Sequence, residues 1–190
     1  GRVRRAFGAF VGGRRTPHLF GYLSDHGDTI GEHGVFGKKT FFEKSVKIPL
    51  LLAGTGVAAG RRWDEPVSIL DVGPTVCAWA GAETPERADG QSLASILRGE
   101  DGPRGRAVLS ESMDKGPDGR WTYGCMARRG TYKFITYHGY ESQNMLFDVA
   151  ADPLEQNNLA AARPGMCEEF RWLLRQATDP AAAEALQAQH

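Results

Sequence analysis

Short apolar runs separated by glycine-rich or polar turns make up the first half of the chain. Residues 19–23 (Leu-Phe-Gly-Tyr-Leu) predict a short buried strand that ends at the polar string 24–28. Residues 46–53 form a second, nearly continuous apolar run, as expected for a strand in a covered sheet. Pro49 has no amide proton to donate, so this strand should lie at an edge or begin near Pro49.

Two helices are predicted next. Ser68 and Asp71 have the spacing of a capping box, Pro74 falls in the first turns, and Gly81 should end the helix after about a dozen residues. A shorter helix follows and ends at Gly99; its apolar face consists of Leu93, Ile96 and Leu97.

The hydrophobic period changes after residues 100–106, a polar, turn-rich stretch that suggests a boundary. Four short strands are predicted beyond it, over residues 107–110, 121–127, 132–137 and 145–149. An amphipathic helix follows, with Phe170, Leu173, Leu174 and Ala177 on one face, and the tail after Pro180 is expected to fray. The pattern predicts a layered α/β piece followed by a small antiparallel sheet with a C-terminal helix.

Composition narrows the class of protein without naming a function. Hydrophobic residues make up 41% of the 190, as in an ordinary globular chain, and no stretch approaches the roughly 20 apolar residues of a membrane span. Lys plus Arg and Asp plus Glu number 23 each, which gives no reason to propose nucleic acid or an anionic membrane as partner. The widely spaced Cys77, Cys125 and Cys167 form neither a disulfide framework nor a zinc pattern.

The start of the chain is atypical. Residues 1–18 are rich in arginine and contain no Asp or Glu, which superficially resembles a transit peptide. Because the segment runs directly into apolar residues and then a charged motif, we expect a truncated or frame-shifted boundary instead. A signal peptide would precede Gly1, so the sequence does not predict the localisation.

The polar string after the first strand is the strongest candidate for chemistry. Asp25 and His26 are adjacent at a strand end, where a carboxylate oxygen and an imidazole nitrogen can face one divalent cation. By residue type alone, Ser-Asp-His-Gly is more often a turn in which the aspartate caps backbone amides. Both interpretations stay open on these residues alone.

An ordered series of short sequence motifs favours the metal-site interpretation over the turn. It comprises Ser24-Asp-His-Gly-Asp28, Gly31-Glu-His-Gly34, Gly37-Lys38, Phe41-Phe-Glu43, Ser45-Val-Lys-Ile-Pro-Leu50, Ser68-Ile-Leu-Asp71, Pro74-Thr75, Gly81, Gly90-Gln-Ser-Leu93, Leu97-Arg-Gly99, Tyr132-Lys-Phe134, Leu146-Phe-Asp148, Asp152-Pro153 and Asn157-Asn-Leu159. The series spans about residues 20–160. It closely resembles the carboxy-terminal portion of the sulfatase family, within the alkaline-phosphatase-like superfamily.

The resemblance implies a fold and a set of site residues. Residues 19–105 would be the end of an alkaline-phosphatase-like α/β domain, and residues 106–190 a small α+β subdomain. Asp25 and His26 match the second pair of ligands of a divalent cation, usually Ca²⁺, with Mg²⁺ and Mn²⁺ as alternatives; His26 stands where some members have Asn. Lys38 matches a lysine that contacts a sulfate oxygen, where an ammonium group can neutralise charge as the S–O bond breaks.

The polar neighbours of these residues have simpler interpretations. His33 is a second candidate for the substrate mouth, although a histidine in a glycine-rich loop is more often structural. Lys39 is expected to be solvated, and Glu43 and Lys47 to pair with each other or support the loop. The loop 140–144 could reach a substrate or could only turn the chain.

The nucleophile of the family is not found. Sulfatases carry a Cys or Ser in a Cys/Ser-x-Pro-x-Arg string, which is oxidised to formylglycine. The nearest string here, Cys125 to Arg129, has Ala127 in place of proline and follows the metal motif instead of preceding it. We therefore interpret Cys125 as a small buried hydrophobe, and we expect formylglycine only in an N-terminal part missing from this chain.

Three functions stay open on the sequence. The first is a sulfuric ester hydrolase that acts on a small-molecule sulfate ester and is represented here by its carboxy-terminal part. The second is a phosphonate or phosphate ester hydrolase of the same superfamily. The third is a non-catalytic fragment marked by exposed apolar sheet. The paired aspartates of the first metal half-site are also absent, and Ca²⁺ usually takes 6–8 oxygen ligands, so we expect little or no activity from the chain alone.

Overall fold

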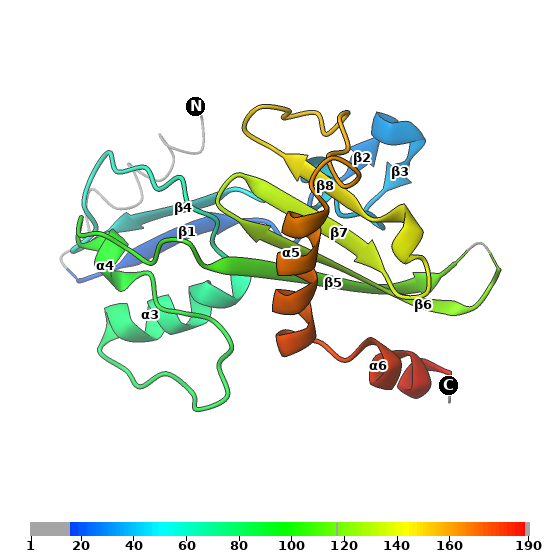
Figure 1. The fold of residues 1–190 in the computed structure, drawn as a ribbon. Coiled ribbons are helices and arrows are strands. Elements are labelled where there is room, and N and C mark those ends of the chain that lie inside the picture. The colour runs from blue at the N-terminus through cyan, green and yellow to red at the C-terminus, as the bar shows by residue number, and fades with distance from the viewer. Residues whose placement is uncertain (1–15, 117, 189–190) are drawn as a thin grey trace.

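The computed structural model describes residues 16–116 and 118–188. Within these ranges the strands form two two-stranded sheets, β1-β4 and β2-β3, and one four-stranded sheet with the order β5-β6-β7-β8. Figure 1 shows α5 crossing one face of the four-stranded sheet, with the β1-β4 pair and α3 toward one end of the molecule. The Arg-rich start predicted over residues 1–18 lies largely outside the described residues.

The first sheet pairs two strands that are distant in sequence. β1 (Leu19–Leu23) runs antiparallel to β4 (Leu50–Gly54). The position of β1 confirms the prediction. For the second strand, predicted over 46–53, the predicted start was wrong, because Val46 belongs to the helix α2 (Glu43–Val46). Pairing begins directly after Pro49, which lacks an amide proton. This strand was also expected to lie in a sheet whose faces are covered. Within the described residues that expectation was wrong, since Leu51 is 62% exposed.

The glycine-rich loop folds as a small hairpin on top of α2. β2 (Thr29–Ile30) pairs with β3 (Phe36–Gly37), and a short 3-10 helix, η1 (Glu32–Gly34), connects them. The amide of Gly27 donates a 2.6 Å hydrogen bond to the carbonyl oxygen of Ser45. A Cβ at Gly27 would lie 2.0 Å from the carbonyl oxygen of Lys44, so only glycine permits this approach.

The predicted helix after residue 68 is present. The 3-10 turn η2 (Ile69–Asp71) continues into α3 (Val72–Ala80), and Ser68 with Asp71 forms the expected capping box. Gly81 ends the helix with φ 71°, in the left-handed region that favours glycine. The shorter helix α4 (Ala94–Leu97) follows.

The second half is a four-stranded meander. It consists of β5 (Ala107–Lys115), β6 (Trp121–Arg129), β7 (Tyr132–Tyr137) and β8 (Met145–Asp148), with the 3-10 turn η3 (Glu141–Gln143) before β8. All four predicted strands are present, although β5 runs five residues beyond the predicted end at Ser110. The extension pairs with the first residues of β6, from Lys115↔Trp121 to Glu111↔Cys125.

This sheet is the middle layer between two apolar clusters. On one face, Phe134 and Leu146 pack with Phe170 and Leu174 of α5 (Pro164–Ala177). On the other face, Phe41 packs with Met126, Ile135, Phe147 and Val149. The segment around Phe41, which precedes α2, therefore takes the place that a helix fills on the opposite side.

The tail forms a helix, so the expectation that it frays was wrong. α6 (Pro180–Gln187) begins at Asp179, whose carboxylate accepts a 3.0 Å hydrogen bond from the amide of Ala182. The carboxylate of Glu184 accepts a 2.8 Å hydrogen bond from the amide of Tyr123, and its other oxygen lies 2.9 Å from Nδ1 of His138. These long-range contacts fix a segment that composition alone leaves undetermined. In the described part of the chain, no helix has the length and apolar character needed to cross a membrane.

Candidate functional site

Asp25 and His26 lie where the chain leaves β1. The Oδ1 atom of Asp25 accepts a 3.0 Å hydrogen bond from the His26 amide, and its Oδ2 atom lies 3.4 Å from Nε2 of His26. The Nδ1 atom of His26 lies 2.6 Å from the carbonyl oxygen of Gly27, a contact that requires the proton on Nδ1. Nε2 is then an acceptor, and a carboxylate oxygen and an imidazole lone pair face each other.

Lys38 completes this group from the other side of the β2-β3 hairpin. Its Nζ atom lies 2.7 Å from Nε2 of His26, and its carbonyl oxygen accepts a 2.9 Å hydrogen bond from the hydroxyl of Ser45. The ammonium group therefore donates to the imidazole lone pair. The structure brings together the three residues that the sequence singled out from two separate strings.

The electrostatics of this group favour an ionised carboxylate. The hydrogen bond from the His26 amide, the largest cause, holds the pKa of Asp25 below its usual value. The side chain of Asp25 is 82% exposed and that of His26 is 39% exposed. A carboxylate and an ammonium group thus flank one imidazole at an open surface, accessible to a small ion or ester.

The donor set fits part of a divalent-cation site. Asp25 supplies a carboxylate oxygen and His26 an imidazole nitrogen, and both atom types bind divalent metals. Among the residues that the structure describes, no three His, Cys, Asp or Glu side chains gather as a metal cluster. Ca²⁺ usually takes 6–8 oxygen ligands, so these two residues could form only half of such a site.

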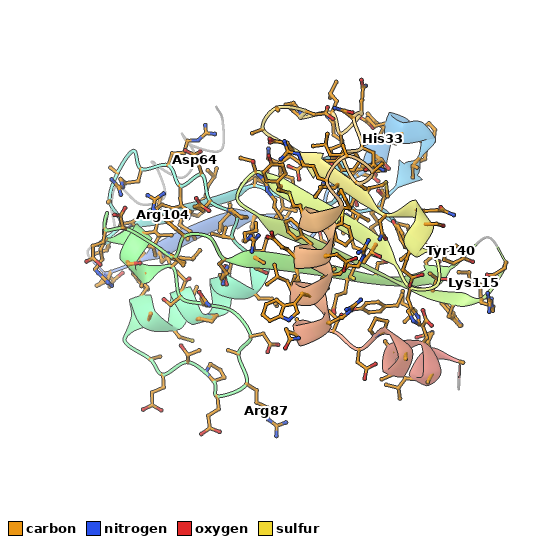
Figure 2. All side chains as sticks on the ribbon, in the orientation of Figure 1. His33, Asp64, Arg87, Arg104, Lys115 and Tyr140 are labelled. Carbon is orange, nitrogen blue, oxygen red and sulfur yellow. The ribbon has the colours of Figure 1, made fainter. Side chains whose placement is uncertain are left out.

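His33 lies against an aromatic side chain instead of joining the site group. Its ring stacks on Phe42 with centroids 3.7 Å apart and planes 3° from parallel. Figure 2 shows His33 on the side of the molecule that carries β2 and β3. This contact explains the residue as packing between the hairpin and α2, and the role at the substrate mouth stays a prediction.

A buried ionic cluster, which the sequence analysis did not predict, lies beneath the segment that follows Lys38. The predicted contact of Glu43 with Lys47 is present at 3.8 Å, but Arg128 lies closer, at 3.1 Å, and so does Lys133, at 3.2 Å. Lys133 is fully buried and also pairs with the buried Glu155. The sequence held one indication that Lys133 is buried. Lys133 shares a sheet face with Ile135, two residues further on, and that face is apolar.

Cys125 is placed as a core residue, as predicted. Its side chain is buried in the cluster beneath α5. Burial, together with the Glu111 carboxylate, raises the pKa of the thiol to about 12. A thiol that stays protonated and enclosed at neutral pH cannot serve as a nucleophile toward an external ester.

Comparison with known proteins identifies the family. Residues 31–174 match the family described as N-sulphoglucosamine sulphohydrolase, C-terminal. Arylsulfatase K of Danio rerio is 33% identical over 170 residues, which cover 83% of this chain and 31% of that protein. The choline-sulfatase of Rhizobium meliloti (strain 1021) is 38% identical over 142 residues, which cover 73% of this chain and 26% of that protein.

Solved structures show the same relationship. A 2-O GAG sulfatase superposes with a TM-score of 0.73 at 31% identity, covering 83% of this chain and 35% of that one. A phosphonate monoester hydrolase from Silicibacter pomeroyi superposes with a TM-score of 0.69 at 25% identity, covering 83% and 34%. The chain belongs to the sulfatase family and has the α/β architecture expected of its carboxy-terminal portion. It spans about a quarter to a third of the length of these relatives.

Proposed function

We propose that this chain forms the carboxy-terminal part of a sulfuric ester hydrolase. In this proposal Lys38 contacts the sulfate group, and Asp25 with His26 forms one half of a divalent-cation site. The observation that supports the proposal is the 2.7 Å contact between Lys38 Nζ and His26 Nε2, because Asp25 Oδ2 lies 3.4 Å from the same nitrogen and one small ligand could contact all three side chains. Membership of the sulfatase family supports the same assignment.

The roles follow from the chemistry of each group. The Lys38 ammonium is a compact cation that can neutralise charge on non-bridging sulfate oxygens as the ester bond breaks. The hydrogen bond to the Gly27 carbonyl orients the His26 ring and leaves Nε2 as the acceptor atom, which Lys38 contacts here and which a cation would take over from Lys38. A bound divalent cation would act as a Lewis acid on a sulfate oxygen. We propose Ca²⁺ at Asp25 and His26, with Mg²⁺ and Mn²⁺ as alternatives.

The nucleophile is proposed to come from outside residues 1–190. Cys125 is enclosed and protonated, and we assign the attacking group to formylglycine in a separate part of the intact enzyme. The substrate would be a small-molecule sulfate ester. The chain alone is expected to show little or no turnover, and hydrolysis of an aryl sulfate that Lys38→Ala abolishes would contradict this expectation.

A phosphonate ester is the second candidate substrate. The superposition on a phosphonate monoester hydrolase supports it only as a property of a family relative. A phosphonate carries a tetrahedral anionic centre like that of a sulfate ester, so Lys38 could contact either one. Binding of methyl sulfate and methylphosphonate to this chain, measured side by side, separates the two candidates.

The test of the main proposal is sulfate binding followed by NMR. Inorganic sulfate should shift the signals of Lys38 and His26, and Lys38→Met should weaken binding by about tenfold, as expected for loss of a charged hydrogen bond. Lys44→Met is the matched control, because Lys44 is an exposed lysine paired only loosely with Glu32, at 3.8 Å. Equal sulfate binding by the wild type and the Lys38→Met variant would refute the role of Lys38.

The cation site needs a separate readout. Calorimetric titration with Ca²⁺ and with Mn²⁺ should show weak binding to the wild type, because the chain contributes only two ligands. Asp25→Asn should abolish this binding, whereas Asp28→Asn, three residues further on, should leave it. Binding that survives Asp25→Asn would remove Asp25 and His26 from the metal assignment.

A further inference from the structure

Hydroxyl groups of two buried side chains hold the peptide planes on either side of Lys38. The hydroxyl of Thr29 donates a hydrogen bond to the carbonyl oxygen of Gly37, which belongs to the plane before Lys38. The hydroxyl of Ser45 donates a 2.9 Å hydrogen bond to the carbonyl oxygen of Lys38, which belongs to the plane after it. Thr29 is 1% exposed and Ser45 is 2% exposed, so water does not readily replace either donor.

This arrangement determines the direction in which the Lys38 side chain leaves the backbone. A peptide unit is planar, so the backbone of one residue has only two soft torsion angles, φ and ψ. A hydrogen bond on each flanking plane restrains both angles, and with them the direction of the Cα–Cβ bond. Gly37, directly before Lys38, has φ 97°, a backbone conformation that favours glycine.

Ser45 also restrains the histidine of the site. Its carbonyl oxygen accepts the 2.6 Å hydrogen bond from the amide of Gly27, which lies in the peptide plane after His26. The carbonyl oxygen of His26, in the same plane, accepts a 2.8 Å hydrogen bond from the hydroxyl of Ser24. Ser45 is therefore hydrogen-bonded to the chain both at Lys38 and directly after His26, the two residues whose side chains meet at 2.7 Å.

Ser45 is itself anchored to the core. It lies in α2, and its amide donates a 2.8 Å hydrogen bond to the carbonyl oxygen of Phe42. The first amide of α2, that of Glu43, donates to the buried carboxylate of Glu155. The ring of Phe42 also stacks on His33 of the β2-β3 hairpin. Helix α2 is thus a support to which both parts of the proposed site are attached.

An exposed lysine needs such a support to bind a ligand well. Lys38 is exposed, and a lysine side chain loses rotamer entropy when its ammonium group is held at one position. A mobile backbone at Lys38 would add to that loss. Because φ and ψ are restrained in advance, only the side-chain torsion angles remain to be ordered when a ligand binds.

We propose that Thr29 and Ser45 are positioning residues of the sulfate site. Their hydroxyl groups hold the backbone of Lys38 so that its ammonium group lies beside Nε2 of His26, and they act on the ligand only through Lys38. The inference rests on the proposed function, because it takes Lys38 as the sulfate contact. It gives two buried hydroxyl groups an effect on sulfate affinity that is separate from their effect on stability.

Thr29 offers two substitutions that separate the hydroxyl group from its packing. Thr29→Val keeps the shape and removes the hydroxyl group, whereas Thr29→Ser keeps the hydroxyl group and removes a methyl group. Thr29→Val should weaken binding of inorganic sulfate by about threefold, as expected for loss of one neutral hydrogen bond, and Thr29→Ser should bind nearly as well as the wild type. Ser45→Ala should weaken binding by about the same factor, and the two changes combined by roughly tenfold.

A spectroscopic measurement follows the geometry without any ligand. In the wild type, nuclear Overhauser effects should connect the terminal methylene group of Lys38 with the two carbon-bound ring protons of His26, because these protons flank Nε2. The effects should weaken in Thr29→Val and in Ser45→Ala and should persist in Thr29→Ser. Overhauser effects that neither Thr29→Val nor Ser45→Ala weakens would overturn the inference.

Thr75→Val is the matched control for a general loss of stability. Thr75 is fully buried in α3, its hydroxyl donates to the carbonyl oxygen of Asp71, and it accepts a 2.8 Å hydrogen bond from the amide of Leu93. Figure 1 shows α3 well away from the β2-β3 hairpin. In urea unfolding, Thr75→Val should lose at least as much stability as Thr29→Val, yet it should leave sulfate affinity and the Overhauser effects unchanged.

Equal weakening of sulfate binding by Thr75→Val and Thr29→Val would reduce the effect to stability and overturn the inference. So would a Thr29→Ser variant that binds sulfate as weakly as Thr29→Val, because the hydroxyl group would then be irrelevant. Near-ultraviolet circular dichroism shows whether each variant keeps its fold. If Thr29→Val does not, Ser45→Ala decides the question against the same control.

Failure of this inference and failure of the proposed function give different results. Sulfate binding that Lys38→Met weakens, but that Thr29→Val and Ser45→Ala leave unchanged, would overturn the inference and leave the proposed function standing. Sulfate binding indifferent to Lys38→Met would contradict the proposed function. Overhauser effects lost in Thr29→Val and Ser45→Ala would in that case still support the positioning of Lys38 against His26.

Discussion

The ammonium group of Lys133, fully buried in β7, donates a 2.8 Å hydrogen bond to the carbonyl oxygen of Phe41. Phe41 follows Lys38 by three residues, so the four-stranded sheet holds the segment that carries the proposed sulfate contact. Glu155, which pairs with Lys133, also accepts a 2.6 Å hydrogen bond from the amide of Glu43. The second half of the chain thus positions a loop of the first half.

Replacing Lys133 with methionine should strongly destabilise the chain. Removing one partner of a buried ion pair typically costs about 3–5 kcal/mol, because the charges left behind lack compensation. Lys44→Met, which removes an exposed lysine, should cost less than about 1 kcal/mol. Urea unfolding curves of the two variants measure both losses of unfolding free energy. A loss for Lys133→Met as small as that of the control would contradict the role of Lys133 in holding the segment around Phe41.

The stability of the chain should fall in acid through Asp71. Burial alone would raise the pKa of this carboxyl, but hydrogen bonds from Arg106 and from the amides of Gln91 and Ser68 outweigh it and lower the pKa. A lowered pKa in the folded state means that the stabilisation is complete above the unfolded value of about 3.9. It is lost as the pH falls from there through the folded pKa.

Asp71→Asn separates this contribution from general acid denaturation. The variant should lose about 2–4 kcal/mol at neutral pH, since the neutral amide cannot pair with the Arg106 guanidinium. Below about pH 4 its stability should depend less on pH than that of the wild type. Asp64→Asn, at an exposed pair with Arg62, is the control and should follow the wild type. Parallel pH profiles for the Asp71→Asn variant and the wild type would contradict the assignment.

The three cysteines should differ in reactivity. Burial raises the pKa of Cys125 to about 12 and also raises the pKa of Cys167, and both side chains are enclosed, whereas Cys77 is half-buried. In the native chain at pH 8, iodoacetamide should label Cys77 first, and all three thiols should react in urea. Mass spectrometry of the labelled peptides measures the order. Labelling of native Cys125 as fast as Cys77 would reopen its assignment as a core residue.

The apolar face of the first sheet should make the isolated chain self-associate. Tyr22 and Leu51 lie directly opposite each other in the β1-β4 register, and both are exposed. Leu51→Lys should weaken self-association by roughly tenfold, as expected for loss of one buried leucine at the contact. Trp172→Lys, at an exposed position of α5 on another part of the surface, should change it less. Sedimentation velocity over a range of concentrations measures both, and a monomeric wild type would contradict the prediction.

The sequence by itself determined features that depend on neighbours along the chain. The capping box of Ser68 and Asp71, the four strands after residue 106 and the amphipathic face of α5 follow from short spacings, because periodicity and capping are local. The ordered motifs placed Asp25, His26 and Lys38 in one proposed site. Cys125 was interpreted as a core residue because its string has Ala127 in place of proline and follows the metal motif.

Only the tertiary structure decided which distant segments meet. Three features depend on partners far away in sequence: the antiparallel pairing of β1 with β4, the hydrogen bond from the Glu43 amide at the start of α2 to Glu155, and the anchoring of α6 by Glu184. Lys133 makes the point most directly, because a lysine in a strand is usually solvated, and burying it required the carboxylates of Glu43 and Glu155. Charge compensation in a core is a property of three-dimensional contacts, and a linear pattern does not contain it.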